Sequence, residues 1–321
     1  MENSQIWEIE KKASLFLYPD QMKQLEQVLY EVCEKPKTSN YSNCDLLKLF
    51  ETAKTVEGCS KRSMAYYHYV IRKFFVAVTK SVIEMTTDDV RNYLNLESQK
   101  SSMSRVSLDN IRRILSSFFS WLEEEDYIRK SPVKRIHKIK SPKIIKEAFS
   151  DEQLTKIEEA CSSLRDTVIV ELLESTGMRV GELVKLQKKD IDFERKECVV
   201  FGKGAKERKV YFDSKTKLHL QIYLSSRVDG EEAAFVSLLK PHKPLEISGV
   251  ETMLRTLGKE SSIAKVHPHR FRRTLATKAI AKGMPIEQVQ MLLGHTKIDT
   301  TMNYAIVDEN NVENSYRRCI G

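Results

Sequence analysis

Apolar side chains recur with the period of an amphipathic helix over much of residues 41–130. Segments 46–55, 63–80 and 108–124 carry apolar residues three and four positions apart, which predicts helices with one buried face. A fourth segment, 86–96, opens with Thr-Thr-Asp-Asp, in which a hydroxyl can cap a helix and the acids suit its positive end. No strand pattern interrupts this stretch, so it predicts a helical domain.

The first 40 residues predict a smaller element. Apolar residues at helical spacing run over 18–34, and a stretch of Pro, Thr, Ser and Asn then breaks the pattern. We interpret residues 1–40 as an N-terminal helical extension.

From residue 149 the pattern changes to short helices and alternating strands. Ser150 and Gln153 have the spacing of a capping box, and we expect helices to about residue 160 and over 164–175. Segments that alternate apolar and polar side chains follow, at 190–193, 198–201 and 208–212. Helices are expected again after about residue 216. The expected fold class is therefore mainly α with a small antiparallel β-sheet (α+β).

A strongly basic segment, RKSPVKRIHKIKSPKIIK at 129–146, separates the two patterns. It holds eight Lys or Arg residues and no acid, and its two Ser-Pro pairs disfavour helix. It could be a solvated connector, but we favour a segment that lies along phosphates, because counterion release rewards clustered positive charge. We expect domains at 41–130 and 149–321, a linker at 131–148 and a tail from 306. The linker residues expected to contact DNA are Lys130, Lys134, Arg135, Lys138, Lys140 and Lys143.

The composition is that of an ordinary globular protein, and we expect this protein to work inside the cell. Hydrophobic residues make up 41% and charged residues 31%, and the net charge of +8 suits a polyanionic partner without proving one. No apolar run approaches the roughly 20 residues of a membrane span, and the N-terminus lacks the pattern of a signal peptide. The six cysteines form no C-x-x-C pair, which argues against a disulfide framework or a metal finger.

Two motifs in the second half place basic residues on turns. In TGMRVGEL at 176–183, Gly177 can end a helix in the left-handed conformation, which puts Arg179 beside the next helix and in a position to hold an anion. In FGKGAKERKVYF at 201–212, Lys203 and Lys206 fall at a hairpin tip, and the spacing is not that of a P-loop. Taken singly, each is most often a surface residue.

Two further motifs carry histidines and a tyrosine. In VHPHRFRRTLAT at 266–277, His269 and Arg272 are three apart and share one face of a helix start. In MLLGHTKIDTTMNYA at 291–305, Gly294 ends a helix, His295 follows, and Tyr304 comes nine residues later. Zinc binding by the histidines is disfavoured because no Cys or acid completes a ligand spacing. We expect no metal and no cofactor.

Taken together and in order, these residues resemble the signature of the tyrosine recombinase (phage integrase) family. The matching positions are Arg179, Lys203, His269-x-x-Arg272, His295 and Tyr304, with the phrases QMLLGH at 290–295 and TTMNY at 300–304. The resemblance covers about residues 41–321. One departure is Arg273, where many members have histidine, and residues 1–40 have no match.

The resemblance implies an enzyme that cuts and rejoins DNA through a 3′-phosphotyrosine on Tyr304. Arg179 and Arg272 would hold the scissile phosphate, since a guanidinium can donate two parallel hydrogen bonds. His269 would be the base and His295 a hydrogen-bond partner. The general acid would be Lys203, with Lys206 and Lys209 as competitors. By the same resemblance Glu182 braces the site, although it could also be an exposed helix residue. Further DNA contacts are expected from Lys206, Arg270 and Arg273.

The resemblance also implies partners and an assembly. A helical core-DNA-binding domain and a mixed catalytic domain would clamp double-stranded DNA, and a homotetramer would act on paired sites, with an accessory directionality factor in some reactions. The expected place is the prokaryotic cytoplasm, at the nucleoid. The tail, with Val312, Tyr316 and Ile320 at helical spacing, would dock on a neighbouring protomer or pack on its own domain.

Several alternatives stay open from the sequence. The chain could instead be a DNA-binding protein without catalysis. It could also be a type IB topoisomerase, which uses similar chemistry to relax supercoiled DNA. Among recombinases, we favour the integration or excision of a mobile element over chromosome or plasmid resolution.

Overall fold

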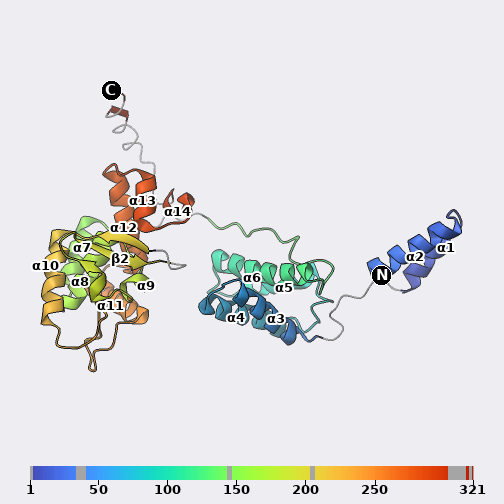
Figure 1. Cartoon of the computed structure of the whole chain (residues 1–321), viewed down its shortest axis with the longest axis horizontal. Coiled ribbons are helices and arrows are strands. Elements are labelled where there is room, and N and C mark those ends of the chain that lie inside the picture. Colours follow the sequence, from blue (N-terminus) through green and yellow to red (C-terminus); the bar gives the residue numbers. More distant parts are fainter. Residues whose placement is uncertain are drawn as a thin grey trace. The chain divides into compact units, whose positions relative to one another are not determined.

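The computed structural model describes residues 3–33, 41–142, 147–202, 207–302, 316–317 and 320. The chain divides into two compact units, Met1–Ile144 and Ile145–Gly321, which are described separately below (Figure 1). No helix in the described ranges is long and apolar enough to cross a membrane.

The first unit begins with a helical hairpin, α1 (Asn3–Ala13) and α2 (Pro19–Cys33), whose two helices contact each other. The helix predicted over 18–34 corresponds to α2. Helix α1 was not predicted, because polar and charged residues predominate in its sequence, NSQIWEIEKKA, although the few apolar residues recur at helical spacing.

Four helices build the rest of the first unit: α3 (Asn43–Val56), α4 (Lys61–Ala77), α5 (Thr87–Ser98) and α6 (Arg105–Glu124). All four begin at a hydroxyl side chain that accepts a hydrogen bond from a backbone N–H of the first turn. Helix α6 contacts α4 and α5. Its face joins a core rich in aromatic rings, which includes Phe50, Phe74, Phe118 and Phe119. The four predicted helices are confirmed.

Part of the basic segment belongs to this first unit. Val133 is buried, and Ile136 and Ile139 pack against the same core. The backbone N–H of Ile139 also donates to Asp109 Oδ1 at 2.9 Å. The basic side chains point outward, since the following are all exposed: Lys130, Lys134, Arg135, Lys138 and Lys140. The segment is thus anchored by its apolar residues and presents its charge to solvent.

The second unit combines helices with a three-stranded antiparallel sheet in the order β1-β2-β3. The strands are β1 (Ile191–Asp192), β2 (Glu197–Phe201) and β3 (Glu207–Tyr211). Cys198 of β2 pairs with Val210 of β3. The predicted sheet is confirmed, with a shorter first strand than expected.

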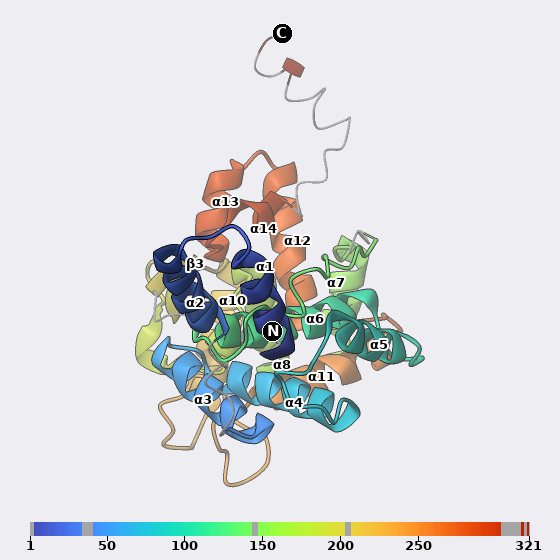
Figure 2. The same ribbon diagram turned by 90° about the vertical axis from the view of Figure 1, so that its right-hand side faces the viewer.

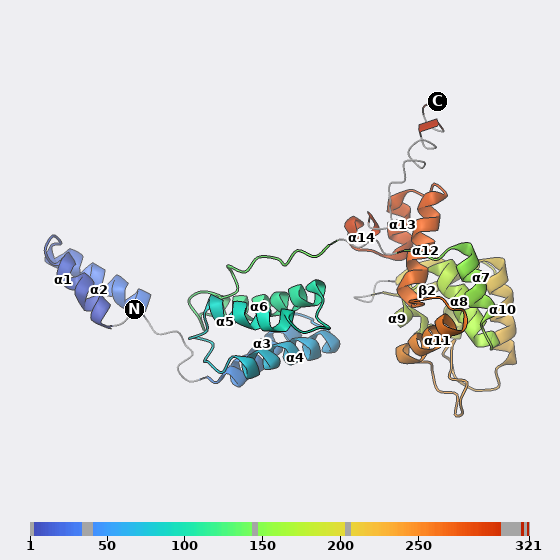
Figure 3. The same cartoon turned by 180° about the vertical axis from the view of Figure 1, so that it is seen from behind.

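The helices of this unit surround α8 (Leu164–Thr176), which is buried on nearly all sides. Helices α7 (Asp151–Glu159), α10 (Ser214–Ser226) and α12 (Pro268–Ala281) contact it directly. The remaining elements are α9 (Val180–Leu183), the 3-10 helix η2 (Lys188–Asp190), α11 (Ile247–Glu260), α13 (Ile286–Leu293) and α14 (Ile298–Met302). Figures 2 and 3 show α12 leading from the body of the unit to α13 and α14.

Candidate active site

Arg179 lies on the tight turn between α8 and α9. Gly177 ends α8 with φ +59°, as its motif predicts, and a Cβ there would come within 2.7 Å of a Leu275 methyl. Arg179 then begins α9, and its backbone N–H and Nη1 both donate to the carboxylate of Glu182, at 2.8 and 2.9 Å. A third of the Arg179 side chain, 33%, remains exposed, so its guanidinium can meet a ligand.

Glu182 is shared by two arginines. Arg208 of β3 donates Nη1 and Nη2 to the two carboxylate oxygens, at 2.6 and 2.7 Å. Burial alone would raise the pKa of Glu182, but hydrogen bonds from Arg208 and Arg179 outweigh it and hold the pKa below its usual value. The structure thus gives Glu182 the bracing position that the resemblance implied.

Sequence reasoning missed Arg208. The available signal was strand alternation: Arg208 is two residues before the buried Val210, so both side chains point to the same face of β3. A charged residue on the buried face of a strand requires a partner, but the sequence does not say which one.

Arg272 is buried, at 2% exposure. Its Nη1 donates to the carbonyl of Gly177 at 2.8 Å, and its Nη2 donates to the carbonyl of Leu293. Arg179 Nη2 donates to the next carbonyl, that of Gly294, at 3.1 Å. The two arginines therefore meet at the turn after α8 and at the end of α13, which lie far apart in the sequence.

His295 follows directly. Gly294 ends α13 with φ +63°, as expected, and His295 Nδ1 lies 2.8 Å from Thr301 Oγ1 of α14. Burial, followed by the positive charges of Arg272, Arg179 and Arg208, lowers the pKa of His295 to about 4. The ring is therefore neutral near pH 7 and can exchange hydrogen bonds without adding charge.

His269 lies in the first turn of α12, one turn before Arg272, and is exposed. It borders a cavity of about 700 Å³ that is also lined by Val180, the residue after Arg179. The His269 side chain and the Arg179 turn thus adjoin one hollow of the surface.

Two of the predicted catalytic residues, Lys203 and Tyr304, lie outside the described residues, as do Lys143 and Lys206. Lys203 falls between β2 and β3, and Tyr304 follows α14 by two residues. Within the described ranges, the structure brings Arg179, Arg272 and His295 together.

Arg270 is committed to contacts within its own unit. It is 8% exposed, and it donates to the carbonyls of Ala264 and Ala148 and to Gln153. Its guanidinium also lies 4.0 Å from the centre of the Phe149 ring. These contacts give Arg270 a structural role, and we withdraw it from the DNA-binding set. Arg273 donates to the carbonyl of Glu147 at 2.8 Å and is partly exposed.

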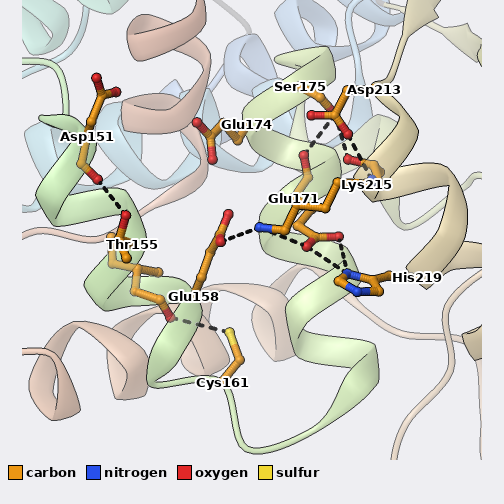
Figure 4. Close-up of polar contacts among 12 residues, drawn as sticks. Asp151, Thr155, Glu158, Cys161, Glu171, Glu174, Ser175, Asp213, Lys215 and His219 are labelled. Carbon is orange, nitrogen blue, oxygen red and sulfur yellow. Dashed lines mark hydrogen bonds and ion pairs between the residues drawn. The ribbon is translucent and has the colours of Figure 1, made fainter.

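A second polar cluster joins α7, α8 and α10 (Figure 4). Glu171 of α8 pairs with His219 at 2.8 Å and with Lys215 at 3.3 Å, and Lys215 also pairs with Glu158 at 2.5 Å. A cavity of about 950 Å³ opens beside this cluster. None of the predicted site residues that the structure describes lines it.

Comparison with known proteins assigns the chain to a family. The model of the phage integrase family matches residues 147–311, and that of the phage integrase N-terminal SAM-like domain matches residues 46–129. The chain belongs to the phage integrase family. Tyrosine recombinase XerA of Pyrococcus horikoshii is 31% identical over 83% of this chain and 90% of its own length. The chain is thus a tyrosine recombinase, of the class that cleaves and rejoins DNA.

Two solved structures share the fold of this recombinase. The XerH site-specific recombinase bound to a palindromic difH substrate has a TM-score of 0.69 at 19% identity, over 97% of this chain and 93% of that one. A lambda integrase tetramer bound to a Holliday junction has a TM-score of 0.68 at 20% identity, over 86% of this chain and 87% of that one. The two-domain, mainly helical fold class expected from the sequence is confirmed.

Proposed function

We propose that this recombinase attacks a DNA phosphodiester with Tyr304 while Arg179 and Arg272 hold the scissile phosphate. The observation that carries the proposal is the convergence of both arginines and His295 on the end of α13. Two guanidinium groups and a neutral imidazole form a preorganised set of donors for a phosphate whose negative charge grows during attack.

The chemistry balances without an external energy source. The Tyr304 oxygen forms a bond to phosphorus and its proton passes to His269, while the bond to the 5′ oxygen breaks and Lys203 protonates that oxygen. The phosphotyrosine conserves the energy of the broken bond. A 5′ hydroxyl from another strand reverses the step and rejoins the DNA.

We propose double-stranded DNA as the substrate and a homotetramer on paired sites as the active assembly. The exposed basic side chains of 130–140, together with Arg273, would contact phosphates, since they stay outside the core of their units. The lambda integrase and XerH relatives were solved on DNA, which supports the same kind of partner. An accessory directionality factor and action at the prokaryotic nucleoid belong to this proposal.

The C-terminal tail would link protomers. Tyr316 and Ile320 are 62% and 73% exposed, and the cavity of about 950 Å³ is lined by Leu275, Met284 and Glu174, among others. We propose that a neighbour's tail inserts its apolar residues there and turns Arg317 toward Glu174. Tetramers and recombination that survive deletion of 307–321 would refute this docking.

The decisive test traps the covalent intermediate. Purified protein is incubated with a labelled, nicked duplex from the DNA junction beside its gene, and the products are run on a denaturing gel. We expect a slow, protease-sensitive band that Tyr304→Phe abolishes. Equal duplex binding by both proteins with no band, on this junction and on chromosomal candidate sites, would favour a non-catalytic DNA-binding protein. The site that is cleaved also separates element integration from chromosome or plasmid resolution.

A further inference from the structure

We infer that Arg208 is a positioning residue, which orients Arg179 toward the scissile phosphate through Glu182 and the end of α13. The inference rests on the proposed function, because it assumes that Arg179 binds the phosphate. We do not assign that task to Arg208 itself, because all three of its guanidinium nitrogens already donate, to the Glu182 carboxylate and to the carbonyl of Leu292.

Three arginines hold three consecutive backbone carbonyls at the end of α13. Arg208 Nε donates to Leu292 at 3.1 Å, Arg272 donates to Leu293, and Arg179 donates to Gly294 at 3.1 Å. The last carbonyls of a helix have no partner within the helix and form the negative end of its dipole. The three guanidinium groups supply these partners and fix the backbone directly before His295.

Gly294 shows how closely Arg208 packs beneath this turn. A Cβ added at Gly294 would lie 2.9 Å from Arg208 Cδ and 3.3 Å from its Nε. The Arg208 side chain therefore packs directly against Gly294, and the carbonyl of Gly294 accepts a hydrogen bond from Arg179. Arg179 donates to both Glu182 and the carbonyl of Gly294. A shift of Arg208 would therefore move both of these partners together.

The charges explain why Glu182 needs two arginines. With Arg179 alone, the buried carboxylate would form a neutral pair and draw the positive charge away from the phosphate. Arg208 binds both carboxylate oxygens, so the group of three keeps one net positive charge. Arg208 thus compensates Glu182, and Arg179 can bind an anion.

The test compares single-turnover cleavage of three nicked duplexes that differ only at the scissile linkage. One has the natural phosphate. The second has a methylphosphonate, which lacks the negative charge, and the third has a 5′-bridging phosphorothiolate, whose thiolate leaves without a general acid. The variants are Arg208→Met and Arg208→Lys. Arg165→Met is the matched control, because Arg165 is similarly buried, at 10% side-chain exposure, and pairs with Asp166 elsewhere in the unit.

We expect Arg208→Met to slow cleavage of the natural phosphate by about 10- to 100-fold, the range that misplacement of a binding group produces. The ratio of methylphosphonate to phosphate cleavage should rise at least about tenfold, since a neutral linkage depends less on the charge of Arg179. The rate and the ratio for Arg208→Lys should lie between those of Arg208→Met and the wild type, because lysine keeps the charge but not the two parallel hydrogen bonds. Arg165→Met should leave this ratio unchanged.

Two results would overturn the inference. An equal loss on all three linkages would mean a general structural role, and rescue by the phosphorothiolate alone would place the effect on the general acid of the hairpin. Arg208→Lys keeps the test valid if Arg208→Met does not fold. If the wild type forms no covalent band on any linkage, the proposed function fails. If the wild type forms the band and Arg208→Met cleaves the natural phosphate as fast as the wild type does, only this inference fails.

Discussion

Arg179 and Arg208 bind the same carboxylate, that of Glu182, although one residue begins α9 and the other lies in strand β3. Both also hold carbonyls at the end of α13, at Gly294 and Leu292. The Arg179 turn, the sheet and the histidine segment are therefore joined through one ion pair network around the buried Glu182. Such networks are costly to break, because each lost partner leaves a buried charge or polar group without compensation.

Substitution of Gly294 should disturb this network. Its φ of +63° favours glycine, and alanine in that region costs about 1–2 kcal/mol. In Gly294→Ala the new methyl group would also displace Arg208, so we expect both a lower urea midpoint and a loss of cleavage. Gly58→Ala is the control, because Gly58 has φ +85° and nothing within 4 Å of its added Cβ. Intact cleavage by Gly294→Ala would contradict the packing argument.

Thr301 should matter for the orientation of His295. Its buried hydroxyl lies 2.8 Å from His295 Nδ1, and the partner of one ring nitrogen sets which nitrogen carries the proton. We expect Thr301→Val to lower single-turnover cleavage by roughly tenfold, the lower end of the effect of such supporting bonds, with little change in DNA binding. In the control Thr155→Val, the lost hydroxyl donates to the carbonyl of Asp151 in its own helix (Figure 4). Equal rates for Thr301→Val and wild type would show that Thr301 does not orient the ring.

His295 should titrate far below an ordinary histidine. Its pKa is lowered from 6.5 to about 4, so the unfolded chain binds more protons than the folded chain between these values. The free energy of unfolding should therefore fall as the pH falls from about 6.5 to about 4. NMR of the ring carbons would report the pKa, and His295→Gln should flatten the pH dependence of urea unfolding in this window. A ring that titrates near 6.5 in the free protein would refute the burial argument.

The basic segment should contribute to the salt dependence of DNA binding. Lys138 is exposed, and a lysine that neutralises one phosphate adds about 0.9 to the slope of log affinity against log salt concentration. We expect Lys138→Ala to reduce the slope by about that amount. Lys12→Ala, which removes a lysine of α1 that pairs with Glu8, should leave the slope unchanged. Unaltered slopes for both variants would favour a solvated connector.

Local sequence signals predicted much of this fold. The caps at Thr86 and Ser150 lie where hydroxyl side chains precede a helical pattern. Gly177 takes the left-handed conformation expected of it, and Gly294 ends its helix as expected. These signals are reliable because caps, helical periods and positive φ angles depend on neighbours within a few residues along the chain. The order of the motifs also predicted the family, because that order is a property of the sequence and needs no knowledge of the tertiary structure.

The packing of distant residues was decided only by the tertiary structure. Arg208 pairs with Glu182, which is 26 residues away in the sequence, and donates to Leu292, which is 84 residues away. Arg179 donates to Gly294, which is 115 residues away. Arg270 lies within the basic HRFRR motif, and only its burial against Phe149 shows that its charge is used inside the domain. Composition and spacing determined which groups the chain contains, whereas their exposure and partners depend on which surfaces meet when the helices and the sheet pack.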